Sequence, residues 1–105
     1  MFISIRKYRV SGTAKDLAQQ VSDGFVPILK QISGFRGYHF LDCGSHVVVT
    51  ISMFDSEEAA LESIERSRMW VQENVAQYLS EPPEIVTGAT LIEMDPTGET
   101  TGVAG

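Results

Sequence analysis

The sequence predicts an α+β domain of the ferredoxin-like type, with an antiparallel four-stranded sheet that carries two helices on one face. One observation is a hairpin pattern at residues 34–54, where two runs rich in Phe, Tyr, Val, Ile and Thr flank Gly44 and Ser45. Another is that a strand pattern and a helix pattern precede this hairpin, and a helix pattern and a strand pattern follow it. The order strand, helix, strand, strand, helix, strand is the split βαβ arrangement, and right-handed crossovers then predict the sheet order 4-1-3-2.

Composition narrows the classes of partner. The 105 residues carry 14 acidic and 8 basic side chains, a net charge of -6, and the basic residues form no stripe that would bind nucleic acid. Cys43 is the only cysteine, which excludes an internal disulfide and is compatible with a reducing compartment. No apolar leader and no apolar run of about 20 residues is present, so we expect a cytoplasmic protein without a membrane segment.

The first two elements follow from their periodicity. Residues 2–10 alternate between two faces, which is typical of a strand. From Thr13 the apolar residues recur at helical spacing, and Asp16 lies in the first turn, where the helix dipole favours it. Gly24 and Pro27 interrupt this helix because proline lacks the backbone N–H. The interruption is either a packing irregularity or a kink that holds the helix away from the sheet and leaves a cavity.

The register of the hairpin stays open at this stage. A link of even length pairs His39 with Thr50 and Tyr38 with Ile51, and a link of odd length exchanges their faces. In the second hairpin strand, one set of alternate residues is uniformly apolar. We expect this set to lie under the helices: Val47, Val49, Ile51 and Met53.

The second helix begins at a predicted capping box, in which Asp55 caps the helix and Glu58 reaches back to it. We expect it to continue to about Leu79, before two prolines forbid helix. Its predicted inner stripe is apolar with one exception, Arg68: Ala60, Leu61, Ile64, Arg68, Val71, Val75 and Leu79. Residues 84–94 alternate again and form the predicted last strand. We therefore expect one domain over residues 1–94 and a flexible polar tail over residues 95–105.

The sheet face without helices is predicted to be too apolar to remain in water. We expect a homodimer that buries this face. The residues assigned to it are Phe2, Ser4, Tyr8, Val48, Thr50, Ser52, Phe54, Val86, Thr90, Ile92 and Met94.

Three segments carry a resemblance to a known family: GFVPILKQISGFRGY at 24–38, VVTISMFDSEEAA at 48–60, and WVQENV at 70–75. Over residues 2–94 the chain resembles the antibiotic biosynthesis monooxygenase-like domain of the dimeric α+β barrel superfamily. The resemblance implies a homodimer with a pocket between helices and sheet. It also implies oxidation of a small aromatic or quinol-type molecule by dioxygen without a cofactor. Haem-degrading members of the superfamily need an axial ligand, usually histidine, on the second helix, and residues 55–79 contain none.

Candidate ligand-binding residues come partly from this resemblance. Trp70 and Asn74 share a helix surface and are plausible counterparts of a Trp and an Asn associated with the site in oxygenase members. The indole ring would stack on an aromatic ligand, and the amide would bond its oxygen. The alternative is that Trp70 packs at the helix edge or at the dimer interface and that Asn74 is solvated.

Strand residues complete the candidate site. His39 is the best base by residue type, with the alternative that it is structural. Tyr38 and Tyr8 are candidates for ligand contact, and Arg6 or Arg36 would balance a substrate anion unless they are surface residues. Two histidines without a third ligand at a recognisable spacing predict no metal site. Two other functions stay open: a binding or sensor domain without catalysis, and a purely structural dimeric module.

Overall fold

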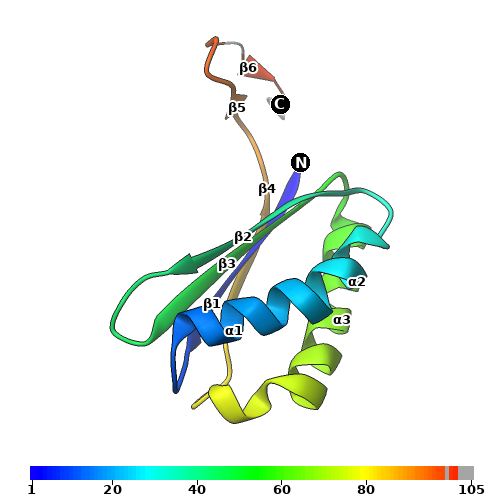
Figure 1. The fold of residues 1–105 in the computed structure, drawn as a ribbon. Coiled ribbons are helices and arrows are strands. Elements are labelled where there is room, and N and C mark those ends of the chain that lie inside the picture. The colour runs from blue at the N-terminus through cyan, green and yellow to red at the C-terminus, as the bar shows by residue number, and fades with distance from the viewer. Residues whose placement is uncertain (99, 102–105) are drawn as a thin grey trace.

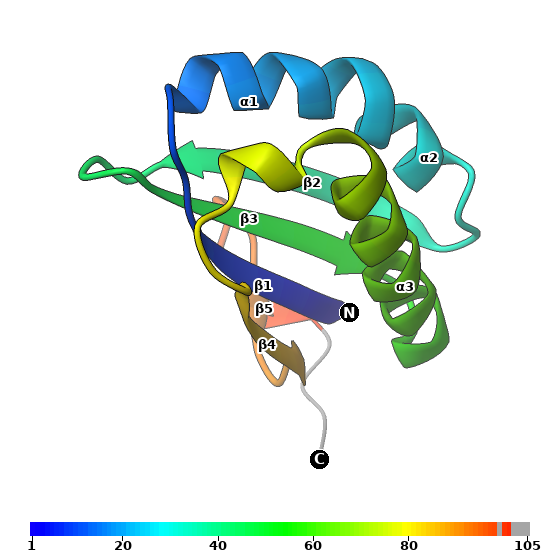
Figure 2. The same cartoon turned by 90° about the horizontal axis from the view of Figure 1, so that it is seen from below.

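The computed structural model describes residues 1–98 and 100–101. Its main sheet has four antiparallel strands in the order β2-β3-β1-β4, which confirms the predicted order 4-1-3-2 and the ferredoxin-like class (Figure 1). The three α-helices lie on one face of this sheet (Figure 2). The strands are β1 (Phe2–Arg9), β2 (Phe35–Asp42), β3 (Val47–Phe54) and β4 (Glu84–Ala89), and the helices are α1 (Ala14–Gln20), α2 (Val26–Lys30) and α3 (Glu57–Asn74).

The helices cover the sheet unevenly. Helices α1 and α2 pack over β2, whereas α3 packs over β1 and β3. Every residue of β4 is exposed. The edge of the sheet at β4 is therefore left open on the helix side.

The first helical segment is continuous across the predicted interruption. Thr13 caps α1, because its hydroxyl accepts a hydrogen bond from the amide of Asp16 at 3.2 Å. A π-helical turn, η1 (Val21–Phe25), follows, and α2 then starts with Pro27 in its first turn, where a missing N–H costs little. The irregularity is thus a π-turn before Pro27. Turns of this kind occur frequently at functional sites.

The prediction of which sheet face lies under the helices is wrong. Val48 and Phe54 are fully buried beneath the helices, whereas Val49 and Ile51, on the opposite face, are only partly buried. The covered face also carries polar residues, and their presence misled an assignment that was based on apolarity alone. These buried polar residues are Ser4, Arg6, Thr50 and Ser52.

The hairpin has the odd register. His39 pairs with Ile51, and Tyr38 pairs with Ser52. Because Ser52 is buried under the helices, Tyr38 points to the helix side and His39 to the open side.

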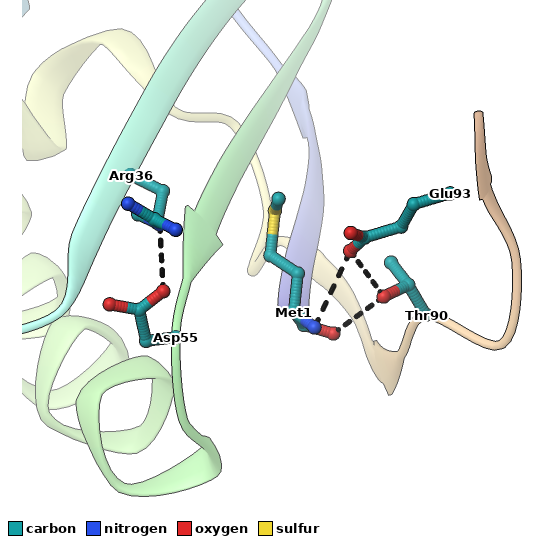
Figure 3. Close-up of polar contacts among 5 residues, drawn as sticks. All are labelled: Met1, Arg36, Asp55, Thr90 and Glu93. Carbon is teal, nitrogen blue, oxygen red and sulfur yellow. Dashed lines mark hydrogen bonds and ion pairs between the residues drawn. The ribbon is translucent and has the colours of Figure 1, made fainter. Parts of the chain in front are cut away.

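The predicted cap of α3 is also wrong. Ser56 is the N-cap, and its hydroxyl accepts from the amide of Ala59 at 3.2 Å. The Asp55 carboxylate instead forms an ion pair with Arg36 across 2.7 Å (Figure 3). Because Asp55 pairs with Arg36 of β2, its carboxylate does not cap the helix.

Helix α3 ends at Asn74, earlier than predicted, and is followed by a short 3-10 turn, η2 (Ala76–Tyr78). The next residues bond instead to the end of β1: the Ser11 amide donates to the carbonyl of Tyr78 at 2.7 Å, and the Ser80 amide donates to the carbonyl of Arg9 at 3.2 Å. These long-range backbone bonds replace the continuation of the helix.

The buried stripe of α3 differs from the predicted one. Leu61 is 54% exposed, and Arg68 is exposed as well. The residues that face the sheet are small: Ala59, Ala60, Ser63 and Ser67. Of these four residues, Ser67 borders the space between the helix and the sheet that is described below.

The predicted last strand is shorter than expected, since β4 stops at Ala89. The Thr90 hydroxyl lies 2.6 Å from a carboxylate oxygen of Glu93, and that oxygen lies 3.4 Å from the amino group of Met1 (Figure 3). Two further strands, β5 (Glu93–Met94) and β6 (Thr100–Thr101), then pair with each other. Residues 99 and 102–105 of the predicted tail lie outside the described residues, and the boundary at residue 94 stays a prediction.

Candidate functional site

An inner chamber lies between the helices and the sheet. Its floor is formed by side chains of the three strands that the helices cover, and its roof includes Phe25 of η1 and Trp70 and Val71 of α3. The chamber volume is about 30 Å³, which holds one or two waters. The floor residues are Arg6, Tyr8, Tyr38, Phe40 and Thr50.

Phe25 of the roof contacts both Trp70 of the roof and Tyr38 of the floor, and we call these three rings together the aromatic wall of the inner chamber. Phe25 meets Tyr38 edge to face, with ring centroids 6.3 Å apart, and meets Trp70 at 5.6 Å. Gly24 of the π-turn makes room for the indole, because a Cβ atom at this position would lie 2.7 Å from Cζ2 of Trp70. The π-turn and its glycine therefore set the position of Trp70 beside the chamber.

A wider outer groove continues from the inner chamber toward β4. The two spaces are adjacent, because five residues line both of them: Arg6, Tyr8, Ser67, Val71 and Leu79. The groove has a volume of about 610 Å³, which lies in the range of sites for small organic ligands. It runs below α3 to Pro83 and Ile85, where no helix covers β4. The open edge of the sheet is thus the entrance to the site.

Arg6 is the charged residue of the junction between chamber and groove. Its side chain comes from the middle of β1, between Ser4 and Tyr8 on the same face, and only 4% of the residue is exposed. Within residues 1–98 and 100–101, no group hydrogen-bonds its Nε or Nη2 atoms. An unpaired buried guanidinium costs several kcal/mol, so its place beside an open space indicates a binding role.

Tyr38 supplies a hydroxyl that stays protonated. Burial raises the pKa of Tyr38, and the neighbouring Tyr8 raises it further. The positive charge of Arg6 and a hydrogen bond with Thr50 act in the opposite direction but are smaller effects. The Tyr38 hydroxyl is therefore protonated near neutral pH and can donate a hydrogen bond.

The structure brings three of the five predicted site residues together. Trp70, Tyr38 and Tyr8 line the inner chamber. His39 is exposed on the open face of the sheet, opposite Ile51, and does not line the chamber or the groove. Its place gives no support to the predicted role as a base, and that role stays a prediction.

Asn74 also lies outside the site. It is exposed at the end of α3, and its side-chain amide donates to the carbonyl of Trp70 at 2.9 Å. This bond closes the last turn of the helix that carries Trp70. A direct contact of Asn74 with ligand stays a prediction without structural support.

Sequence reasoning missed two polar residues of the site, Thr50 and Ser67. Ser63 and Ser67 are four residues apart on α3, and this spacing of small polar residues was the available signal for a helix face next to a cavity. For Arg6 the signal was its alternation with Ser4 and Tyr8 along one strand face. Of the two arginines considered, Arg6 reaches the chamber, whereas Arg36 pairs with Asp55 on the surface.

Neither a metal-ligand cluster nor a membrane-spanning helix is present within residues 1–98 and 100–101. No group of three or more His, Cys, Asp or Glu side chains in this part of the chain has the arrangement of a metal site. None of its helices combines the length and apolar character that crossing a membrane requires.

Solved structures with the same fold include oxygenases and proteins without an assigned function. A protein of unknown function from Nitrosomonas europaea, NE2512, matches with a TM-score of 0.75 and 20% identity, over 92% of this chain and 95% of that one. The ActVA-Orf6 monooxygenase of Streptomyces coelicolor, in complex with Nanaomycin D, matches with a TM-score of 0.74 and 20% identity, over 90% and 91%. SnoaB, a cofactor-independent oxygenase from Streptomyces nogalater, matches with a TM-score of 0.67 and 11% identity, over 85% and 91%.

These matches confirm that the chain has the same ferredoxin-like α+β fold as several antibiotic biosynthesis monooxygenase structures. No protein-family model matches the sequence, and no curated protein matches it either. Because identities at this level show the fold alone, the reaction has to be argued from the site.

Proposed function

We propose that this protein is a cofactor-independent monooxygenase that acts on a small aromatic or quinol-type molecule. The observation that carries the proposal is the chamber with an aromatic wall, which opens through the outer groove at the uncovered strand β4. The outer groove has room for a flat ring, and the inner chamber beside it, which is bounded by the aromatic wall, has room only for a substrate oxygen near the Tyr38 hydroxyl. The same fold in two oxygenases supports the proposal.

The reaction would proceed from the anion of the substrate. Loss of a proton from an activated CH₂ group to a water molecule gives a carbanion, which passes one electron to dioxygen and then forms a C–O bond with the resulting superoxide. The released proton returns to the peroxide. Loss of water leaves a carbonyl group, so that one oxygen atom enters the product and the other leaves as water.

The chain contributes to this reaction by binding and by excluding water. The reacting carbon would lie where the groove meets the inner chamber, and α3 and the covered sheet would keep it away from solvent there, which protects the peroxide. The Tyr38 hydroxyl would donate to the oxygen on which negative charge collects. We assign no step to His39, since it lies on the other face of the sheet.

We also propose that the functional unit is a homodimer formed through the open face of the sheet. Val86 is 67% exposed there, and Ile5 and Leu41 are exposed as well. Together with the partly buried Val49 and Ile51 they form an apolar surface that a second copy would cover. Of the set predicted from sequence, only Val86 lies on this face, because the others lie under the helices or beyond the end of β4.

Oxygen uptake with a panel of quinols and anthrones tests the proposed reaction. We expect uptake above the autoxidation rate of each compound, and a roughly tenfold or larger loss in Tyr38→Phe. Tyr78→Phe is the matched control, because the Tyr78 hydroxyl accepts from Gln20 at 2.8 Å and lines neither space of the site. If ligands bind but no compound increases uptake, the chain is a binding domain without catalysis.

A further inference from the structure

An aromatic site alone does not explain why Arg6 is buried beside it. A stacking pocket for a neutral ring needs no cation, yet the floor of this one holds a guanidinium that is almost completely buried. Its Nε and Nη2 atoms lack hydrogen-bond partners within the part of the chain that the structure describes. Such a group destabilises the empty protein, and binding sites are where proteins retain groups of this kind.

The other charged side chains near Arg6 do not neutralise it. Glu81 lines the outer groove, but its carboxylate pairs with Arg9 at 2.9 Å. Arg68 on the opposite wall is itself a cation, and its partner Glu65 is exposed on α3. The site therefore has an excess of positive charge, although the whole chain has a net charge of -6.

The position of Arg6 also orients a ligand. Arg6 lines both the inner chamber and the outer groove, and its unpaired atoms are buried. Beyond this junction, the side chains that line the groove alone include the apolar Ile64 of α3 and Ile85 of β4. A ligand with an anionic end and an apolar body fits this order of groups from the inside outward.

We propose that the ligand is an aromatic molecule with an oxyanion, either a carboxylate or a phenolate, that pairs with Arg6. This inference rests on the proposed function, which supplies the aromatic body of the ligand, and it adds that the ligand carries a negative charge. The planar guanidinium presents adjacent N–H donors that match two oxygens of a carboxylate or the single oxygen of a phenolate. The body lies outward along the groove, so that neutral rings lose the charge-assisted bonds and bind more weakly.

A comparison of matched probes tests the inference. Calorimetric titration near neutral pH compares 2-naphthoate with 2-naphthamide, which have nearly the same shape and differ in charge. We expect the carboxylate to bind at least about tenfold more tightly, as one charge-assisted pair implies. The phenolate form is tested by the absorbance of 4-nitrophenol, whose pKa should fall when the protein binds it.

Substitutions assign the preference to one residue. Arg6→Met should abolish the difference between naphthoate and naphthamide and the pKa shift of nitrophenol, and Arg6→Lys should retain part of both. Arg36→Met is the matched control and should retain both, since Arg36 lies on the surface and pairs with Asp55. Far-UV circular dichroism confirms that each variant is folded, and the comparison of probes on the natural chain needs no variant.

The outcomes separate this inference from the proposed function. A preference for either anion that depends on Arg6 supports the oxyanion. Equal binding of naphthoate and naphthamide together with an unshifted nitrophenol pKa overturns the oxyanion but leaves an aromatic pocket. Absence of binding by all probes overturns both. Failure of oxygen uptake with retained anion binding overturns the monooxygenase reaction alone.

Discussion

Gly24 is packed against Trp70 with no room for a methyl group. In Gly24→Ala the new Cβ would lie 2.7 Å from Cζ2, 3.0 Å from Nε1 and 3.1 Å from Cε2 of the indole. Carbon atoms prefer separations of about 3.5–4.0 Å, so the ring has to move by roughly 1 Å. The wall of the inner chamber therefore changes with a substitution that adds a single carbon.

Two opposing free-energy terms decide the effect on stability. Overpacking of this kind costs about 1–3 kcal/mol. Alanine in place of glycine inside a helix stabilises it by about 1 kcal/mol. We expect Gly24→Ala to lower the free energy of unfolding by about 1 kcal/mol, the midpoint of the overpacking cost less the gain in helix propensity.

The sign of the effect should reverse when the indole is absent. Trp70→Leu removes all three atoms that the new methyl group would meet, so only the helix-propensity gain of up to about 1 kcal/mol remains. Urea unfolding of the four chains of this double-mutant cycle, followed by far-UV circular dichroism, measures the coupling, which we expect to be about 2 kcal/mol. Circular dichroism is needed because Trp70 is the only tryptophan.

Ser22→Ala is the control for the cycle, since Ser22 lies in the same π-turn and is exposed. It should change stability by less than about 0.5 kcal/mol with or without Trp70. If Gly24→Ala destabilises the protein equally in both backgrounds, the contact with the indole is not its cause, and the role of the π-turn glycine in placing Trp70 is refuted.

Three other predictions concern pH, capping and assembly. Burial raises the folded-state pKa of Tyr38, so its stabilising contribution is complete below the unfolded-state pKa of about 10 and is lost as the pH rises above that value. Above about pH 10 the melting temperature of the natural protein should therefore fall more steeply than that of Tyr38→Phe, and parallel curves would contradict this. Ser56→Ala should lower the free energy of unfolding in urea by about 1 kcal/mol because it removes the cap of α3. Asp55→Ala should lower it by less than about 0.5 kcal/mol because Asp55 forms only a surface ion pair, and the reverse ranking would restore Asp55 as the cap. Ile5→Lys on the open sheet face should convert a dimer into a folded monomer of 11.5 kDa by light scattering, and a wild-type protein that is already monomeric at micromolar concentration would exclude the dimer.

Local patterns were sufficient for the architecture. Alternation along residues 2–10 and in the hairpin predicted strands, and Thr13 with Asp16 predicted the start of the first helix, because these signals depend only on neighbouring residues. The order of elements and the right-handed crossover rule then determined the strand order of the sheet. The resemblance to a monooxygenase fold came from the same local segments and was confirmed by the solved structures.

Local patterns did not show where a residue far along the chain would compete with a neighbouring residue for the same partner. Asp55 and Ser56 are both good caps, and the choice of Ser56 follows from Arg36, which lies on another strand and attracts Asp55. The length of α3 was likewise decided by backbone bonds of Tyr78 and Ser80 to the end of β1. Local propensity yields in such places because a contact far along the chain contributes more.

The sequence by itself determined the fold and the type of residue available for a site, and the tertiary structure decided which of them share a cavity. The register of the hairpin differs by one residue between its two alternatives, and this difference places Tyr38 under the helices and His39 on the open face. The covered face carries Arg6 and Thr50 although burial of polar groups is unfavourable, and both residues line the chamber beneath the helices. An assignment of the faces from apolarity alone was wrong because the covered face carries buried polar residues. Some of these residues, including the incompletely paired Arg6, line the candidate site.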